Sequence, residues 1–281
     1  MRAYPVTHTG LVREQNEDTV RVAEGACGLY ILADGMGGHL AGEVASRMTA
    51  DEMEKRLFAC AEPSTEIMRE AIQQTNAIVY EKQLTEPEMH GMGTTLTALW
   101  EGREHVYIGH VGDSRAYLFR DGVLRQMTED HSMVGELLRA GAITEEQARN
   151  HPRRNVITQA VGTDISVQPD VFQIIKTPGD IWLLCSDGLT DMVEDAFIAQ
   201  TMAENAPAAA TQLLLDEALK NGGKDNVTVM IVKVAEVKHR QSAEKRYKSN
   251  NKLNLLLHIG RLLVGAGLLV TIADYIYYLL H

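Results

Sequence analysis

The sequence is poor in cysteine, and the three cysteines that it has form no recognisable pattern. Cys27, Cys60 and Cys185 are far apart, and none belongs to a Cys-x-x-Cys pair. Closely spaced pairs of cysteines are typical of disulfide frameworks and of zinc ribbons. The sequence therefore argues against both kinds of site.

An apolar leader and an excess of basic residues are also lacking. Residues 1–14 are polar and do not resemble a secretory signal segment. The net charge is −11, and residues 1–237 hold 20 Lys or Arg against 36 Asp or Glu, a local charge of −16. Because nucleic-acid backbones are bound by Lys and Arg, this part of the chain is not expected to bind nucleic acid. We expect a cytoplasmic, reduced body that is compatible with binding cations.

The 281 residues divide into three stretches that differ in composition and in apolar pattern. Residues 1–236 alternate strand-like and helix-like patterns, which predicts one domain. Residues 237–252 are charged and show no apolar periodicity, as is typical of a linker. Residues 253–281 are largely apolar. No internal repeat is found.

Within the first stretch, short apolar runs separated by turn residues predict strands, and two longer segments predict helices. Apolar residues at helical spacing mark 44–57 and 67–78, and a polar helical segment at 133–150 predicts a surface excursion. Sequential strands beside two long helices favour an α+β layered domain over repeated βαβ units. The predicted strands are 28–33, 94–100, 106–111, 116–119, 123–127, 181–185 and 227–234.

Aspartates recur where the predicted strands begin or end. Asp34 follows the run GLYILA, Asp113 follows VYIGH and a short turn, Asp187 follows WLLCS, and Asp225 precedes VTVMIV across Asn226. A carboxylate at the mouth of a buried strand is costly unless a cation or hydrogen bonds compensate it. Carboxylates are also ligands that Mg²⁺ and Mn²⁺ prefer. Four such acids brought together could hold two ions and activate a water molecule.

Each of these acids alone has a simpler interpretation. Asp-Gly is a common turn dipeptide, as Asp121-Gly122 illustrates in the same chain. Arg13, which lies among acids in GLVREQNED, could make an ordinary surface ion pair. Beside a metal cluster, however, its planar guanidinium would suit a phosphoryl oxygen. The repeated placement of the acids, more than any single one, indicates a site.

Six segments taken together resemble the bacterial type 2C, metal-dependent (PPM-type) Ser/Thr protein phosphatases. They occur in the family's order and with similar spacing across residues 1–236. The segments are GLVREQNED (10–18), ADGMGGHLAGEVAS (33–46), GMGTTL (91–96), VGDSRAYLFRDG (111–122), LCSDGLTD (184–191) and KDNVTV (224–229).

The resemblance implies a four-layer α-β-β-α sandwich with two central antiparallel sheets. It implies that two or three divalent cations, Mn²⁺ or Mg²⁺, lie at one edge of these sheets. Arg13 matches the phosphate-binding arginine of the family, and the segment around 133–150 overlaps its mobile flap. The implied metal ligands are Asp18, Asp34, the carbonyl of Gly35, Asp113, Asp187 and Asp225.

The activity implied by the resemblance is the hydrolysis of phosphoserine and phosphothreonine in proteins by a metal-activated water. The implied partners are phosphorylated proteins and a Ser/Thr kinase whose action the chain opposes. None of the three cysteines belongs to a Cys-x5-Arg motif, which is the pattern of cysteine phosphatases. Two alternatives stay open: a membrane-tethered pseudophosphatase that binds phosphopeptides, and a hydrolase of small phosphoesters.

The chain departs from the family at two places. His8 stands where members commonly have an acid, which could weaken metal affinity through the surroundings of the ligands. Met36 follows Asp34-Gly35, where many eukaryotic members have a histidine proposed as general acid. His39 is the nearest candidate for that proton donor, with a structural role or a metal-bound water as alternatives.

The apolar tail predicts a membrane anchor that the family's catalytic domain does not need. Leu262–Leu280 is 19 residues long, close to the roughly 20 that span a bilayer. Residues 238–281 hold seven Lys or Arg against two Asp or Glu, and most of the basic ones precede the apolar run. By the positive-inside rule that side stays cytoplasmic. We therefore expect a single-pass protein of the cell membrane with a cytoplasmic catalytic domain. Asp274 counts against this expectation, and the alternative is a helix that lies on the membrane or packs against a partner.

Overall fold

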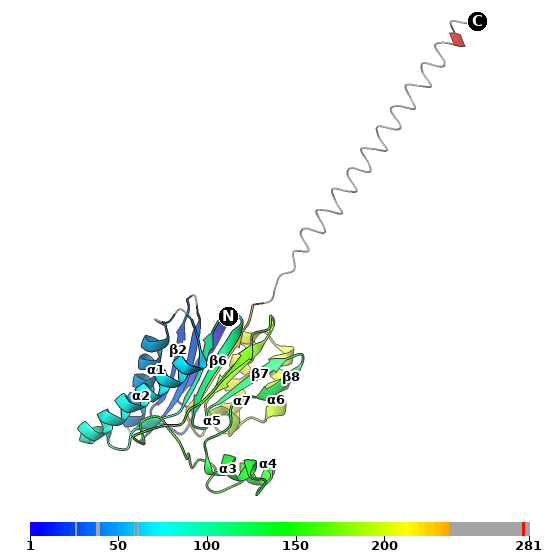
Figure 1. Cartoon of the computed structure of the whole chain (residues 1–281). Helices are drawn as coiled ribbons and strands as arrows, with labels where there is room; N and C mark the ends of the chain where they lie inside the picture. The colour runs from blue at the N-terminus through cyan, green and yellow to red at the C-terminus, as the bar shows by residue number, and fades with distance from the viewer. Residues whose placement is uncertain (26, 38–39, 59, 61, 236–276, 279–281) are drawn as a thin grey trace. The chain divides into compact units, whose positions relative to one another are not determined.

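The computed structural model describes residues 1–25, 27–37, 40–58, 60, 62–235 and 277–278. Residues Met1–Ala235 form one compact unit. Two antiparallel sheets make up its centre, and helices cover both outer faces (Figure 1). The prediction of an α+β fold with two antiparallel sheets is confirmed.

The first sheet has the strand order β2-β3-β5-β6-β9, and the short strand β4 pairs with β3 beside it. Its register places Asp18, the first residue of β2, opposite Asp34 near the end of β3. Two of the predicted ligands are thereby fixed as neighbours by backbone pairing. The strands are β2 (Asp18–Ala23), β3 (Leu29–Met36), β4 (Gly93–Thr94), β5 (Leu96–Glu101), β6 (His105–Val111) and β9 (Asp170–Ile175).

The second sheet has the order β1-β11-β10-β7-β8. Two of its strands adjoin predicted site motifs. Strand β10 ends just before the motif that contains Asp187, and strand β11 begins just after the motif that contains Asp225. The strands are β1 (Arg2–His8), β7 (Arg115–Arg120), β8 (Val123–Gln126), β10 (Ile181–Cys185) and β11 (Val227–Lys233).

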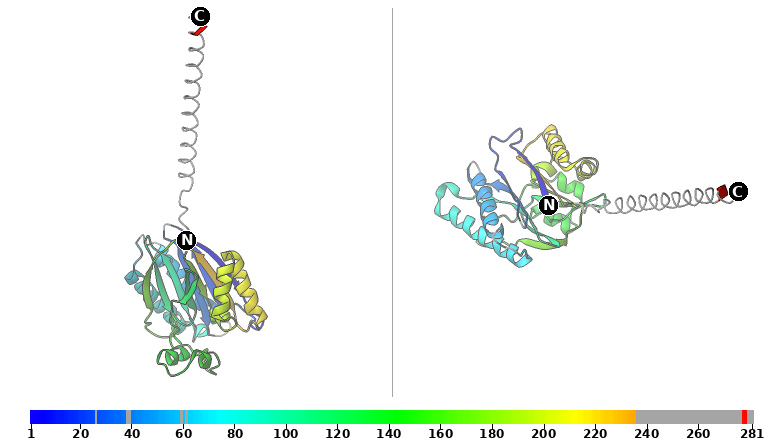
Figure 2. Two further views of the ribbon diagram at one scale, coloured as in Figure 1. Left: turned by 90° about the vertical axis from the view of Figure 1, so that its right-hand side faces the viewer. Right: turned by 90° about the horizontal axis from the view of Figure 1, so that it is seen from above.

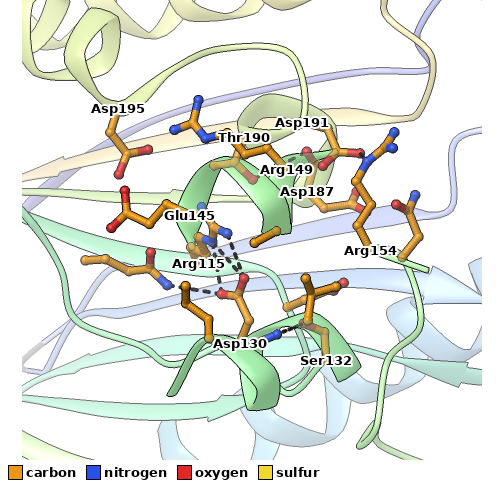
Figure 3. Close-up of a pocket in the computed structure, with 17 residues that line it drawn as sticks. Arg115, Asp130, Ser132, Glu145, Arg149, Arg154, Asp187, Thr190, Asp191 and Asp195 are labelled. Atoms are coloured by element: carbon orange, nitrogen blue, oxygen red, sulfur yellow. Dashed lines mark hydrogen bonds and ion pairs between the residues drawn. The ribbon is translucent and has the colours of Figure 1, made fainter. Parts of the chain in front are cut away.

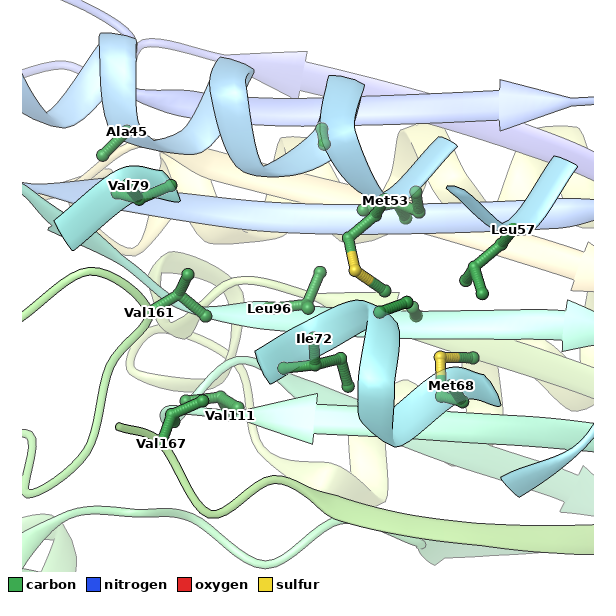
Figure 4. Close-up of a cluster of buried hydrophobic side chains, with 14 of the residues drawn as sticks. Ala45, Met53, Leu57, Met68, Ile72, Val79, Leu96, Val111, Val161 and Val167 are labelled. Atoms are coloured by element: carbon green, nitrogen blue, oxygen red, sulfur yellow. The ribbon is translucent and has the colours of Figure 1, made fainter. Parts of the chain in front are cut away.

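Long helices bury an apolar face against the outside of each sheet. Helices α1 (Leu40–Phe58) and α2 (Thr65–Thr85) pack on the first sheet through a cluster that includes Met53, Met68 and Ile72 (Figure 4). Helices α6 (Asp195–Glu204) and α7 (Pro207–Lys220) cover the second sheet together with the short α5 (Asp187–Thr190) (Figure 2). Helix α7 begins with a proline, which suits the first turn because that turn needs no backbone donor.

A third apolar cluster fills the space between the two sheets. Leu32 and Leu99 from the first sheet meet Trp182, Leu184 and Met230 from the second, and all five are fully buried. Close packing of side chains from two inner faces is what holds a sandwich together. The four layers expected from the resemblance are therefore present.

Several elements were not predicted from the sequence. Strands β1, β2 and β9 and helices α5, α6 and α7 fell in regions without an assigned pattern. Between β8 and β9 the chain forms two short helices, α3 (Met133–Arg139) and α4 (Glu145–Arg149), which project from the end of the sheets (Figures 1 and 2). This agrees with the predicted surface excursion. We call residues 133–156 the flap segment.

The predicted linker (237–252) and nearly all of the predicted anchor (253–281) lie outside the described residues. In the part of the chain that is described, no helix is long and apolar enough to cross a bilayer.

We expect Leu184→Ala to destabilise the protein strongly, because Leu184 is fully buried between the sheets. Loss of such a side chain leaves a cavity and typically costs about 2–5 kcal/mol. Urea unfolding followed by circular dichroism measures the change. The control is Leu84→Ala on the surface of α2, where Leu84 is 66% exposed. Equal midpoints for the two variants would contradict the assignment of the inter-sheet core.

Candidate active site and metal centre

The predicted ligands come together at one end of the two sheets. A cavity of about 340 Å³ opens there, between the ends of β3, β10 and β11 and the loop that carries Arg13. Five of the six predicted ligands line this cavity, and they lie up to 191 residues apart in the sequence. The lining residues are Arg13, Glu17, Asp34, Gly35, Met36, Gly37, Asp113, Asn155, Ile157, Asp187, Asp225 and Asn226.

Asp18 lies buried beside this cavity. One of its carboxylate oxygens, Oδ2, accepts hydrogen bonds from Ser186 Oγ at 2.9 Å and from Thr228 Oγ1 at 2.6 Å. The other oxygen, Oδ1, is buried and has no hydrogen-bond partner. Burial raises the pKa of Asp18 to about 6, although the two hydroxyl donors oppose that shift. An unpartnered buried oxygen is the kind of atom that a cation or its bound water would satisfy.

Asp34, Asp113 and Asp187 are strained electrostatically in the same way. Burial, reinforced by the neighbouring carboxylates, raises the pKa of Asp34 and of Asp187 well above the usual value. Burial together with the nearby Asp130 raises the pKa of Asp113 to about 7. Like charges that are buried together disfavour ionisation of each member. Full ionisation of these groups at neutral pH would therefore need a compensating positive charge.

The donor set fits divalent cations. Among the described residues that line the cavity, Arg13 is the one basic side chain, against five carboxylates. Hard divalent ions bind carboxylate and carbonyl oxygens. Within the described part of the chain, no group of three or more His, Cys, Asp or Glu side chains is already arranged as a ligand set. The acids line a common cavity but do not converge on one point, as expected for carboxylates that repel each other.

Gly35 is required at its position by close backbone approach. A Cβ atom there would lie 2.2 Å from the carbonyl oxygen of Gly42 and 2.7 Å from that of Glu17. The Gly35 amide donates to the same Glu17 carbonyl at 3.1 Å. This packing holds the start of α1 against the end of β3. A role of the Gly35 carbonyl as a ligand stays a prediction.

Arg13 reaches the cavity from an exposed loop. Its Nη2 lies 2.7 Å from Oδ2 of Asp225, and its side chain is 54% exposed. The hydrogen bond to Asp225 raises the pKa of the guanidinium, which stays charged. The arginine is therefore available both to the acids and to an anion arriving from solvent.

Asn226 holds this loop in place and was not predicted as a site residue. Its side-chain amide donates to the carbonyls of Thr9 and Gln15, both at 2.8 Å, and its Oδ1 accepts from the Glu17 amide at 2.8 Å. The position of Asn226 next to Asp225 was visible in the sequence, but its partners lie more than 200 residues away. Asn155, which also lines the cavity, carried no sequence signal.

A second cavity of about 180 Å³ lies between the flap segment and the body. Figure 3 shows Asp130 hydrogen-bonded to Arg115 in this cavity, with Ser132, Glu145 and Asp187 among the other side chains that line it. Asp113, Asn155 and Asp187 line both cavities. The flap segment thus lies beside the acids that are predicted to hold metal ions.

The remaining predicted residues are placed as follows. Met36 lines the first cavity. His8 accepts a hydrogen bond from the Gly10 amide through Nδ1 at 2.9 Å, which stabilises the turn leading to Arg13. His39 lies outside the described residues, and its part in proton transfer stays a prediction.

The sequence of this chain matches the family model described as protein phosphatase 2C over residues 9–221. The chain belongs to this family. It is 40% identical over 234 residues to the serine/threonine phosphatase stp of Listeria monocytogenes, a match that covers 80% of this chain and 93% of the relative.

Solved structures of family members agree with the fold. The serine/threonine phosphatase PstP/Ppp of Mycobacterium tuberculosis superposes with a TM-score of 0.77 at 38% identity, covering 84% of this chain and 99% of that one. The catalytic domain of PstP in complex with two manganese ions superposes with a TM-score of 0.75 at 37% identity, covering 84% and 98%.

We expect Asp34→Asn to stabilise the metal-free protein at pH 7.5. Burial and the neighbouring carboxylates raise the pKa of Asp34 well above its usual value of 3.8. The stability linked to this group is fully present below pH 3.8 and is lost as the pH rises through the raised pKa. Removing the Asp34 charge relieves the repulsion, and we expect a rise in unfolding temperature of several degrees in EDTA.

The informative quantity is the difference between Asp34→Asn and the unmodified protein, measured at pH 5 and at pH 7.5. Buried His110, whose pKa burial lowers to about 4, acts in the opposite sense and loses stability as the pH falls below 6.5. Because His110 is present in both proteins, its contribution cancels when their stabilities are subtracted. We expect the difference to be larger at pH 7.5 and Mn²⁺ to stabilise the unmodified protein more than the variant. An equal response of both proteins to Mn²⁺ would contradict the assigned metal site.

Proposed function

We propose that this protein is a metal-dependent Ser/Thr protein phosphatase that hydrolyses phosphoserine and phosphothreonine in proteins. The observation that carries the proposal is the cavity in which buried and half-buried carboxylates meet a single exposed arginine. Membership of the protein phosphatase 2C family and the named activity of its relatives support the same function. Two or three Mn²⁺ or Mg²⁺ ions are the proposed cofactors, and the manganese complex of PstP supports manganese.

The proposed roles follow from the position of each residue. Asp18, Asp34, Asp113, Asp187, Asp225 and the carbonyl of Gly35 would hold the cations. When bound, the cations supply Lewis-acid polarisation of phosphoryl oxygens and acidify a water molecule. The Arg13 guanidinium can exchange its Asp225 partner for a phosphoryl oxygen, because it sits at the rim of the cavity and is half exposed. A proton-donor role for His39 stays a prediction.

A phosphopeptide-binding pseudophosphatase is the less favoured function. A protein that binds without hydrolysis has no need for metal ligands, yet Asp34, Asp187 and Asp225 all line the cavity. A hydrolase of small phosphoesters would share the same chemistry. Comparison of phosphopeptides with small phosphoesters as substrates separates these possibilities.

We expect the full-length protein to release phosphate from a phosphothreonine peptide when Mn²⁺ is present. Asp34→Ala and Asp187→Ala should each lower kcat by at least about 100-fold, because loss of a group that stabilises transition-state charge has effects of this size. Arg13→Ala should raise KM and lower kcat/KM by about 10- to 100-fold, with partial retention in Arg13→Lys. Malachite-green detection of phosphate provides the measurement.

The matched control is Asp121→Ala, because Asp121 belongs to the same residue type but lies in the β7–β8 turn. It should retain the activity of the unmodified protein. Activity that survives both Asp34→Ala and Asp187→Ala, or that survives chelation, would rule out the proposed mechanism.

We also propose that residues 253–281 anchor the protein in the cell membrane with the catalytic domain on the cytoplasmic side. The proposal rests on the apolar run Leu262–Leu280 and the basic residues that precede it. A membrane-bound phosphatase of this kind would oppose a Ser/Thr kinase that modifies the same proteins.

Fractionation of cells tests the anchor. The full-length protein should remain with membranes after alkaline carbonate extraction, whereas a chain ending at residue 236 should be released into the supernatant. A helix lying on the membrane surface would be extracted by carbonate, and that result would contradict a spanning anchor. Activity of the shortened chain towards the phosphothreonine peptide should match that of the full-length protein.

A further inference from the structure

Both ends of the flap segment meet at His131. Ser132 and Ile157 form an isolated β-bridge, and the Met133 amide donates to the Val156 carbonyl at 2.9 Å. The Thr158 amide donates to the carbonyl of His131 at 2.8 Å. The entry and the exit of the flap segment are therefore paired with each other, and His131 is the residue immediately before this pairing.

His131 is also joined twice to the turn that precedes Asp113. Its amide donates to the Gly112 carbonyl at 2.7 Å, and the Gly112 amide donates to His131 Nδ1 at 3.2 Å. The turn itself has little freedom to move, because Gly112 has φ +107° and a Cβ atom there would lie 2.6 Å from the Thr95 side chain. The imidazole is thus attached to a rigid part of the site.

The hydrogen-bond partners of His131 assign its tautomer. The Gln159 side chain approaches Nδ1 at 3.1 Å, and its Oε1 accepts from the Gln168 amide, so the Gln159 Nε2 group faces the ring as a donor. With two donors directed at Nδ1, that nitrogen acts as the acceptor. Nε2 then carries the hydrogen and donates it to Asp170 Oδ2 at 3.1 Å. Both ring nitrogens therefore have hydrogen-bond partners that fit this single tautomer.

We propose that His131 is a positioning residue that fixes the base of the flap segment to the Gly112–Asp113 turn. Asp113 lines both the metal cavity and the cavity beneath the flap. Through the Nδ1 contact to Gly112, the imidazole holds the flap at a set distance from Asp113 and Asp187. The inference deepens the proposed function, on which it rests: it assigns the position of the flap segment beside the acid cluster to a residue that does not line the metal cavity.

A second attachment lies next to the first. Arg115 makes a bidentate ion pair with Asp130, with Nη2 2.7 Å from Oδ2 and Nε 2.9 Å from Oδ1 (Figure 3). Asp130 directly precedes His131, and Arg115 lies two residues after Asp113, at the start of β7. The flap base therefore stays partly attached when the His131 side chain is removed. Loss of the imidazole should loosen the flap segment without unfolding the domain.

Two conservative replacements separate the two nitrogens of the ring. In His131→Asn the amide oxygen takes the place of Nδ1 and can accept from Gly112, but the contact with Asp170 is lost. In His131→Gln the side-chain amide can reach Asp170, but the acceptor for Gly112 is lost. His131→Ala loses both contacts. His105→Asn, at the opposite end of β6, is the matched histidine control.

Limited trypsinolysis of the full-length, metal-free protein measures the attachment without reference to activity. Mass spectrometry follows cleavage after Arg139, Arg149, Arg153 and Arg154, which all belong to the flap segment. We expect cleavage in His131→Ala and His131→Gln to be about 5- to 20-fold faster, the size expected for the loss of one or two hydrogen bonds in a local opening. His131→Asn and His105→Asn should be cleaved at the rate of the unmodified protein.

Kinetics supplies the second measurement. The Mn²⁺ concentration that gives half-maximal phosphate release should rise at least about 5-fold in His131→Ala and His131→Gln, and should stay within about 2-fold in His131→Asn. Circular dichroism confirms that each variant is folded. The proposal would be overturned if His131→Ala were cleaved at the rate of the unmodified protein. It would also be overturned if His131→Gln were cleaved slowly and His131→Asn fast. An unmodified protein that releases no phosphate would instead contradict the proposed function, while the cleavage rates would still report on His131.

Discussion

The mutual repulsion of buried carboxylates is the constraint on which the rest of this structure depends. Asp18, Asp34, Asp113 and Asp187 are all held where burial and neighbouring acids raise their pKa values. Such an arrangement opposes folding, and the two sheets with their three apolar clusters supply the burial that offsets it. Binding of the proposed cations to the folded form would stabilise it through linkage, and relief of this electrostatic cost would add to the metal affinity.

The acids are held together by backbone geometry and by close packing of glycines. Antiparallel pairing puts Asp18 opposite Asp34, while a Cβ atom on Gly188 would lie 2.0 Å from the carbonyl oxygen of Asn226. The second contact holds the start of α5 against the loop before β11, and hence Asp187 near Asp225. Side chains at sheet ends are thus placed by contacts that tolerate little adjustment. The placement of these acids is therefore set by the pairing and packing of the scaffold.

The flap segment differs from this scaffold in how it is attached. It is connected through polar contacts at its base, chiefly those of His131 and the Arg115–Asp130 ion pair, and its two helices are only seven and five residues long. Hydrogen bonds contribute less net stability than an apolar core does and can open locally. The domain therefore combines a rigid acid cluster with a neighbouring segment whose position depends on a few side chains.

The sequence by itself determined the layered α+β class, most of the central strands and the four aspartates at strand ends, because strand periodicity and strand-end aspartates are local signals. Asp18 was identified only through the family resemblance. The sequence did not reveal β1, β2 or β9, whose residues are mostly only partly buried, or α6 and α7, to which no helical pattern was assigned. Only the tertiary structure decided that Asn226 holds the loop of Arg13 and that His131 joins the flap to Gly112. Those contacts connect residues from 19 to 217 positions apart. Long-range hydrogen bonds leave no period in the sequence, so the fold had to bring the partners together before their roles could be seen.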